Sequence, residues 1–119
     1  MELLLISLLL TKHVIADYFL QRSFMFKDKH VYGGKGGVVH ATIHGFFSWI
    51  ILVFFVPEIA LILAALDGVA HYHIDYLKSG WNFRTKATPA ENRFWYAFGL
   101  DQLAHMLTYV LMVLIATRW

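Results

Sequence analysis

Val38–Val56 reads VVHATIHGFFSWIILVFFV, an apolar run without a lysine, arginine, aspartate or glutamate. A transmembrane helix needs about 20 consecutive, mostly apolar residues, so this run predicts a membrane span. Pro57 marks its end, because the residue before a proline is disfavoured in the helical region. His40 and His44 are separated by about one helical turn, so both side chains lie on one face of the predicted helix.

Three further apolar runs predict the other spans, at about residues 3–20, 59–78 and 94–117. Of the 119 residues, 59% are hydrophobic and only 15% are charged, and the mean hydropathy is +0.57. Four spans use about two thirds of such a chain, which leaves room for one membrane domain over residues 1–119. We therefore expect an all-α fold, an integral membrane four-helix bundle.

Local signals predict where the third and fourth helices begin. Pro57 and Glu58 suit the first turn of the third helix, so the second and third spans should form a tight hairpin. Thr88, Pro89 and Glu91 have the spacing of an N-cap, a first helical position and a capping-box glutamate. The fourth helix is therefore expected to begin at Pro89.

A glycine-rich segment, Gly-Gly-Lys-Gly-Gly at residues 33–37, lies in the first long connection. It lacks the preceding strand and the serine or threonine of a phosphate-binding loop. We therefore expect a flexible linker there.

The basic residues predict an orientation. With four spans, the connections 21–37 and 79–88 lie on the same side of the membrane, and most lysines and arginines lie in or beside them. The positive-inside rule then places both connections in the cytoplasm and both termini outside it. The formal net charge of +2 is too small to indicate a nucleic acid partner. The absence of cysteine excludes disulfides and thiolate metal sites.

Each predicted span carries histidines or aspartates four residues apart. Counted from the cytoplasmic ends at ~1.5 Å per residue, these pairs fall in one layer, about 5 to 15 Å below the surface. Ionisable groups in a span normally face the bundle interior and mark function. Nitrogen and carboxylate ligands without sulfur suit one or two divalent transition metals, namely zinc, iron or manganese. The candidate ligands are His13, Asp17, His40, His44, His71, Asp75, Asp101 and His105.

Other polar residues surround this layer. Asp67 lies one turn deeper on the stripe of His71, and Asp67 or Asp101 is the candidate general base. His30 and His73 are expected to be structural or interfacial. The alternative for the whole layer is a network of hydrogen bonds between packed helices. The candidates for orienting ligands are Gln21, Gln102 and Lys78, and those for binding an anionic headgroup are Arg22, Lys78 and Arg84.

Four motifs carry a family resemblance. They are His13-Val-Ile-Ala-Asp17-Tyr-Phe-Leu-Gln21, His40-Ala-Thr-Ile-His44-Gly45, His71-Tyr-His-Ile-Asp75-Tyr-Leu-Lys78 and Asp101-Gln102-Leu-Ala-His105. Together they resemble the motifs of a small bacterial and phage membrane family, catalogued as domain of unknown function 3307. The resemblance implies a four-helix protein of the bacterial inner membrane, in some cases encoded by a phage, and implies no activity. A weaker similarity, to small membrane-bound metal-dependent hydrolases, favours hydrolysis.

Three functions remain open at this point. The leading hypothesis is a metal-dependent hydrolase that opens towards the cytoplasm and acts on a lipid-linked or phosphorylated substrate. The first alternative is a di-iron membrane oxidoreductase. The second is a non-enzymatic proton or metal conductor, or a membrane regulator. The expected partners are the lipid bilayer, the substrate and, for conduction, further copies of the chain as a homo-oligomer.

Overall fold

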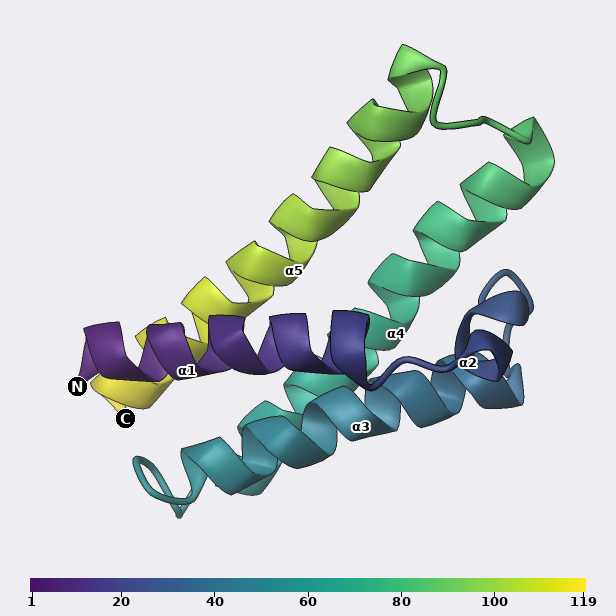
Figure 1. Cartoon of the computed structure of the whole chain (residues 1–119). Coiled ribbons are helices and arrows are strands. Elements are labelled where there is room, and N and C mark those ends of the chain that lie inside the picture. The colour runs from purple at the N-terminus through teal and green to yellow at the C-terminus, as the bar shows by residue number, and fades with distance from the viewer.

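The computed structural model describes all 119 residues and is entirely helical (Figure 1). The four long helical segments correspond to the four predicted spans, and no strand is present. The all-α class is therefore confirmed. The elements are α1 (Glu2–Val14), the π-helical turn η1 (Ile15–Phe19), the short helix α2 (Ser23–Lys27), α3 (Lys35–Leu52), α4 (Ala60–Thr85) and α5 (Asn92–Arg118).

Helices α3 and α4 form the expected hairpin, and small residues let their backbones approach closely. A Cβ on Gly45 would lie 3.1 Å from the Ala64 carbonyl oxygen, and one on Gly68 would lie 3.5 Å from the Ala41 carbonyl oxygen. Such contacts are typical of closely packed membrane helices. Larger side chains at these positions would push the two helices apart.

The helix starts differ from the predicted ones. Helix α4 begins at Ala60, so Pro57 and Glu58 lie in the preceding turn. Helix α5 begins at Asn92 without a side-chain cap, so the capping box predicted from Thr88 is wrong. The Thr88 carbonyl oxygen instead accepts a hydrogen bond from Glu91 N at 2.9 Å, which makes residues 88–91 a separate turn before the helix.

The glycine-rich segment is also not the expected linker. Both carboxylate oxygens of Asp28 accept hydrogen bonds, from Gly36 N at 3.1 Å and from Gly37 N at 3.2 Å. These two glycines lie buried in the first turn of α3, where a carboxylate satisfies free backbone donors. A Cβ on Gly36 would overlap the Phe24 carbonyl oxygen, so α2 and α3 pack in direct backbone contact.

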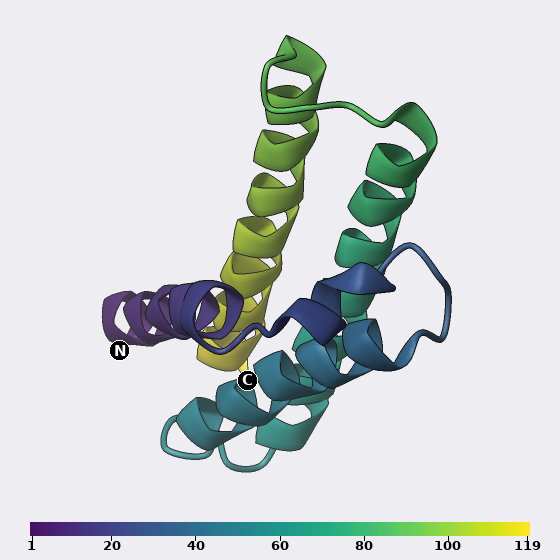
Figure 2. The same cartoon turned by 45° about the vertical axis from the view of Figure 1, so that its right-hand side comes forward.

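The apolar core occupies the end of the molecule where the two termini lie together (Figures 1 and 2). Its members include Leu9, Leu52, Leu63 and Met112, which come from four different helices. Towards the other end, α4 and α5 run side by side beyond α1 in both views. The polar layer described below lies next to the apolar core, on the side away from the termini.

Helix α5 is the one helix that is both long and apolar enough to cross a membrane by length and composition. Helix α1 gives way to η1 after 13 residues. The continuous helices α3 and α4 carry polar residues: Lys35, His40 and His44 in α3, and Asp67, Asp75 and Lys78 in α4. Polar residues thus lower the hydropathy of the segments that build the site. The four-span arrangement remains a prediction.

Candidate metal centre

Helical segments α1 with η1, α3, α4 and α5 bring a set of histidines and aspartates together. Asp17 lies in η1, where Leu20 N donates to the Ile15 carbonyl oxygen at 3.0 Å. Single π turns of this kind are frequent at functional sites. The donor atoms form three overlapping groups, within each of which they lie no more than 4.8 Å apart. These groups contain all eight candidate ligands: His13, Asp17, His40, His44, His71, Asp75, Asp101 and His105.

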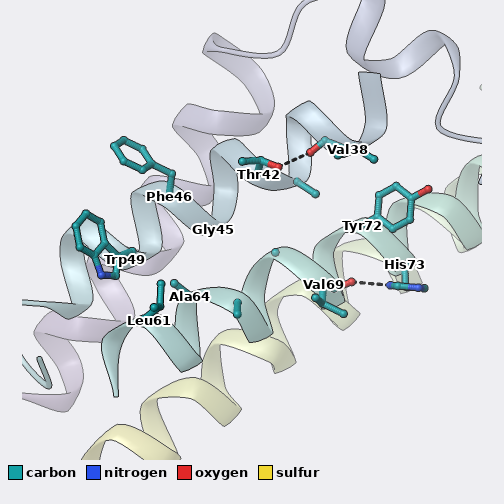
Figure 3. Close-up of a pocket in the computed structure, with 13 residues that line it drawn as sticks. Val38, Thr42, Gly45, Phe46, Trp49, Leu61, Ala64, Val69, Tyr72 and His73 are labelled. Carbon is teal, nitrogen blue, oxygen red and sulfur yellow. Dashed lines mark hydrogen bonds between the residues drawn. The ribbon is translucent and has the colours of Figure 1, made fainter. Parts of the chain in front are cut away.

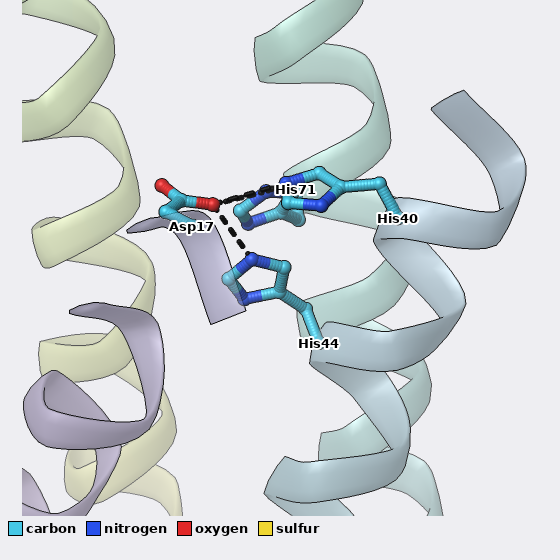
Figure 4. A group of neighbouring side chains, drawn as sticks. All are labelled: Asp17, His40, His44 and His71. Atoms are coloured by element: carbon cyan, nitrogen blue, oxygen red, sulfur yellow. Dashed lines mark hydrogen bonds and ion pairs between the residues drawn. The ribbon is translucent and has the colours of Figure 1, made fainter. Parts of the chain in front are cut away.

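The first group joins Asp17 with His40, His44 and His71 (Figure 4). Asp17 Oδ1 lies 2.8 Å from His44 Nε2 and 3.0 Å from His40 Nε2. His71 Nε2 is 3.7 Å from the same oxygen. Figure 4 shows the carboxylate facing the imidazoles of α3 and α4. One carboxylate and three imidazoles therefore converge on one volume.

The second group joins Asp75, Asp101 and His105. His105 Nε2 lies 3.2 Å from Asp75 Oδ1 and 3.6 Å from Asp101 Oδ1. His71 Nε2 lies 3.2 Å from Asp75 Oδ2 and so borders both groups. His13, His71 and His105 make up the third group, which connects the first two. The three groups therefore form one continuous cluster of residues that could hold a metal ion.

Several of the donor distances lie close to those around a bound metal ion. Around a tetrahedral ion with bonds of about 2.0–2.1 Å, neighbouring donor atoms lie about 3.3 Å apart. The Nε2 atoms of His40 and His71 face each other at 3.2 Å, a distance at which they can share only one proton but can both bind one cation. Asp101 Oδ1 is buried and accepts no hydrogen bond. Buried groups that could hold a metal ion are therefore present, and the identity of the ion stays a prediction.

A buried lysine, which the sequence analysis missed, lies on the core side of this cluster. Lys12 Nζ is 2.7 Å from Asp67 Oδ2, 3.2 Å from the Tyr109 hydroxyl and 3.3 Å from His44 Nδ1. Ser48 Oγ also donates to Asp67 Oδ2. Asp67 belongs to none of the three donor groups. A lysine in an apolar run needs a buried partner, and this requirement could have identified Lys12 from the sequence.

A second lysine that the sequence analysis missed lies on the other side of the cluster. Lys29 Nζ, from the loop after α2, is 3.1 Å from Asp75 Oδ2, and its side chain is mostly buried. Asp28, the neighbouring residue, is the carboxylate that holds the start of α3. The glycine-rich turn therefore fixes the loop that delivers Lys29. This lysine supplies one positive charge beside the aspartates of the site.

The three residues expected to orient the ligands, Gln21, Gln102 and Lys78, make different contacts. Gln102 Oε1 lies 3.2 Å from His13 Nε2, and its amide nitrogen donates to Asp101 Oδ2 at 3.0 Å. Gln21 instead donates to the backbone oxygen of Asp17. Lys78 Nζ lies 5.3 Å from the centre of the Phe98 ring and touches no ligand. Gln102 is thus the only one of the three whose side chain contacts candidate ligand side chains.

His73 and His30 lie outside the cluster. His73 bonds to the Val69 carbonyl oxygen at 2.8 Å and to the Tyr32 hydroxyl at 2.9 Å. The His30 ring stacks on Phe83 with the ring centres 4.1 Å apart. Both histidines make local packing contacts, as the sequence predicts.

The model of a family described as protein of unknown function (DUF3307) matches residues 4–119 of the chain. The protein belongs to this family. The resemblance carried by the four motifs is therefore confirmed. No curated protein and no solved structure matches the chain. The weaker similarity to membrane-bound metal-dependent hydrolases has no support from these comparisons.

Two pockets adjoin the helices of this DUF3307 protein. The outer groove, about 640 Å³, lies between α3 and α4 and contains none of the eight donors (Figure 3). The α4–α5 cleft, about 550 Å³, contains Asp101 in its wall. Lys78 and Arg93 also line this cleft, whereas Arg22 and Arg84 line neither pocket. Of the three residues expected to bind an anion, only Lys78 lines a pocket that also contains a candidate ligand.

Proposed function

We propose that this protein is a metal-dependent hydrolase of the bacterial inner membrane, with two divalent metal ions held by the clustered histidines and aspartates other than Asp101, which stays free as the general base. The observation that carries the proposal is the overlap of the three donor groups, which share His71 and His105. Eight donors exceed what one tetrahedral ion can use. Paired ions are a common means of hydrolysing phosphate and acyl esters.

A membrane location is supported by the outer surface. Along α5, large apolar side chains stay exposed, which is costly in water and favourable in lipid. The long axis of the molecule measures 43 Å, which is comparable with a bilayer and its headgroups at about 40–45 Å. The basic connections would lie on the cytoplasmic side. The exposed residues of α5 include Leu103, Met106, Leu107, Val110, Leu111 and Leu114.

The chemistry we propose is hydrolysis of an ester in a lipid-linked or phosphorylated substrate. Divalent ions held by these residues would supply an activated water molecule and would polarise the bond to be broken. Asp101, whose Oδ1 has no hydrogen-bond donor, would take a proton from the attacking water. The water oxygen would bond to the phosphorus or acyl carbon, the bond to the leaving oxygen would break, and Asp101 would pass the proton that it took from the water to the leaving oxygen. The contact of Asp67 with Lys12 favours Asp101 over Asp67 as the base.

The test is metal-dependent hydrolysis by the full chain in detergent. Chelated protein would be reloaded separately with zinc, manganese or iron and given mono-oleoyl glycerol phosphate, and released phosphate and fatty acid would be measured. We expect turnover with at least one metal, and a loss of about 10²- to 10⁴-fold in Asp101→Asn. His73→Ala, outside the donor groups, is the matched control and should retain turnover. Activity unaffected by chelation would contradict the proposal.

A di-iron oxidoreductase is the second candidate. Asp75 and Asp101 share His105 in one group, and adjacent carboxylates and imidazoles from bundled helices are how di-iron sites are built. Five imidazoles against three carboxylates make the set richer in nitrogen than the carboxylate-rich sites of that class. Mössbauer spectra of anaerobically purified protein separate the two candidates. A coupled di-iron signal at full occupancy favours oxidation, and its absence in a zinc- or manganese-loaded active protein favours hydrolysis.

A further inference from the structure

The α4–α5 cleft is lined by residues 74–81 of α4 and 93–104 of α5, in the part of the molecule where these helices run side by side towards the loop that joins them (Figures 1 and 2). Its volume of about 550 Å³ is within the range of ligand pockets, about 300–1,000 Å³. The wall is mostly apolar. Its lining includes Ile74, Leu77, Trp81, Tyr96, Ala97 and Leu100.

Three charged residues lie in the wall of this otherwise apolar cleft. Asp101, on the buried side, belongs to the donor group with Asp75 and His105. Lys78 lines the same cleft and makes no ion pair, because its ammonium lies over the Phe98 ring instead. Arg93 lines it as well and pairs with Glu91. Two cations and a carboxylate of the candidate centre therefore line a cleft whose wall is otherwise suited to hydrocarbon.

Size alone would favour the other pocket. The outer groove is larger, at about 640 Å³, but no lysine, arginine, aspartate or glutamate lines it. Its polar groups already have partners: Thr42 Oγ1 donates to Val38 O, and the Tyr72 hydroxyl accepts from Gly33 N. The outer groove offers nothing to an anionic headgroup, which makes it an internal control.

We propose that the α4–α5 cleft binds a single-chain anionic amphiphile, with its acyl chain along the apolar wall and its phosphate between Lys78, Arg93 and the metal-loaded Asp101 group. This inference rests on the proposed function and names its substrate class. Charge complementarity carries it, since two cations, Lys78 and Arg93, line the same cleft as Asp101 and would attract a phosphate into it. A chain entering from the lipid would reach the centre without crossing water.

The experiment is a titration of the full chain in detergent, followed by native mass spectrometry. The probe is mono-oleoyl glycerol phosphate, its uncharged counterpart is mono-oleoyl glycerol, and both are added to zinc-loaded and to chelated protein. Wild type should bind one molecule of the phosphate probe about tenfold or more tightly than the uncharged one. Chelation should reduce that preference, because the metal contributes part of the positive charge.

Variants then locate the binding. Ala97→Trp fills the cleft and should weaken the phosphate probe at least about tenfold, whereas Ala65→Trp fills the outer groove and should change its affinity less than about twofold. Lys78→Gln with Arg93→Gln should remove most of the preference for phosphate while the uncharged probe still binds. Circular dichroism and size-exclusion profiles establish that each variant is folded. If Ala97→Trp misfolds, the Lys78 and Arg93 pair decides the question alone.

Three results would overturn the inference: wild type that binds metal but not the probe, unchanged binding in folded Ala97→Trp, and an unchanged phosphate preference in the double variant. Failure of the hydrolase proposal can be distinguished from failure of the cleft proposal. Protein that binds no metal but still binds the probe in the cleft contradicts the hydrolase, whereas protein that binds metal and ignores the probe contradicts only the cleft.

Discussion

Lys12 Nζ lies 2.7 Å from Asp67 Oδ2, and both side chains are almost fully buried. Removing one partner of a buried ion pair leaves the other charge without compensation, which costs about 3–5 kcal/mol. We therefore expect Lys12→Met to lower the thermal unfolding temperature strongly in detergent. Lys27→Met, at an exposed position, is the control and should have little effect. A Lys12→Met protein as stable as wild type would contradict the importance of this pair.

The double variant Lys12→Met with Asp67→Leu refines that prediction. Because replacing both members of a buried pair with apolar residues is often neutral, the double variant should be more stable than Lys12→Met alone. Thermal unfolding of wild type, Lys12→Met, Asp67→Leu and the double variant gives a double-mutant cycle that isolates the interaction between the two residues. Strictly additive effects would mean that the contact contributes nothing measurable.

Most of the candidate site could be predicted from sequence, because it depends on helical spacing. A repeat of four residues puts each His and Asp pair on one face of its helix, and similar distances from the span ends put the four pairs in one layer. Lys12, Lys29 and Tyr109 were missed because their contacts join segments from 32 to 97 residues apart. Those contacts depend on how each helix is rotated about its axis relative to its neighbours. The spacing of residues within one span gives no information about that rotation.

Helix ends were the least predictable part of the fold. Thr88 can cap a helix or close a turn, and the two differ by only a small free energy. The Trp95 indole, which donates to the Pro89 carbonyl oxygen at 2.7 Å, helps to hold the turn. The glycine-rich segment was misinterpreted because its order comes from the Asp28 carboxylate and from contact with α2.

Gly36 provides a test of that packing. An alanine there would overlap the Phe24 backbone, so Gly36→Ala should destabilise the protein although alanine favours helices. Gly99 lies in α5, where an added Cβ would meet no atom within 4 Å, so Gly99→Ala should stabilise by about 0.5–1 kcal/mol. Both variants replace a helical glycine with alanine, and only the surroundings of the added Cβ differ. Equal unfolding temperatures for them would contradict the close approach of α2 and α3.

Asp28→Ala tests the cap on the same segment. Losing the carboxylate that accepts from Gly36 N and Gly37 N should cost about 0.5–2 kcal/mol. It should also loosen the loop that carries Lys29, which would appear as faster amide hydrogen exchange at residues 29–34. Unchanged stability and exchange would mean that the glycine-rich turn holds without the cap.

Gln102 contacts both His13 and Asp101, so it should orient two candidate ligands. Gln102→Leu is expected to weaken metal binding about 10- to 100-fold, as loss of such supporting groups usually does. Gln21→Leu, which loses only a bond to a backbone oxygen, should have a smaller effect. Competition with a metal chelator measures both affinities. The reverse order would contradict the proposed orientation of the ligands.

The metal content of the purified protein tests the central claim most directly. Element analysis of the detergent-purified chain should find about two divalent transition metal ions per molecule, with a clear reduction in His44→Ala and in Asp75→Ala. His73→Ala, outside the donor groups, should match wild type. Absence of stoichiometric metal across several growth conditions, or equal content in all four proteins, would contradict the account and leave the layer as a hydrogen-bonded packing network.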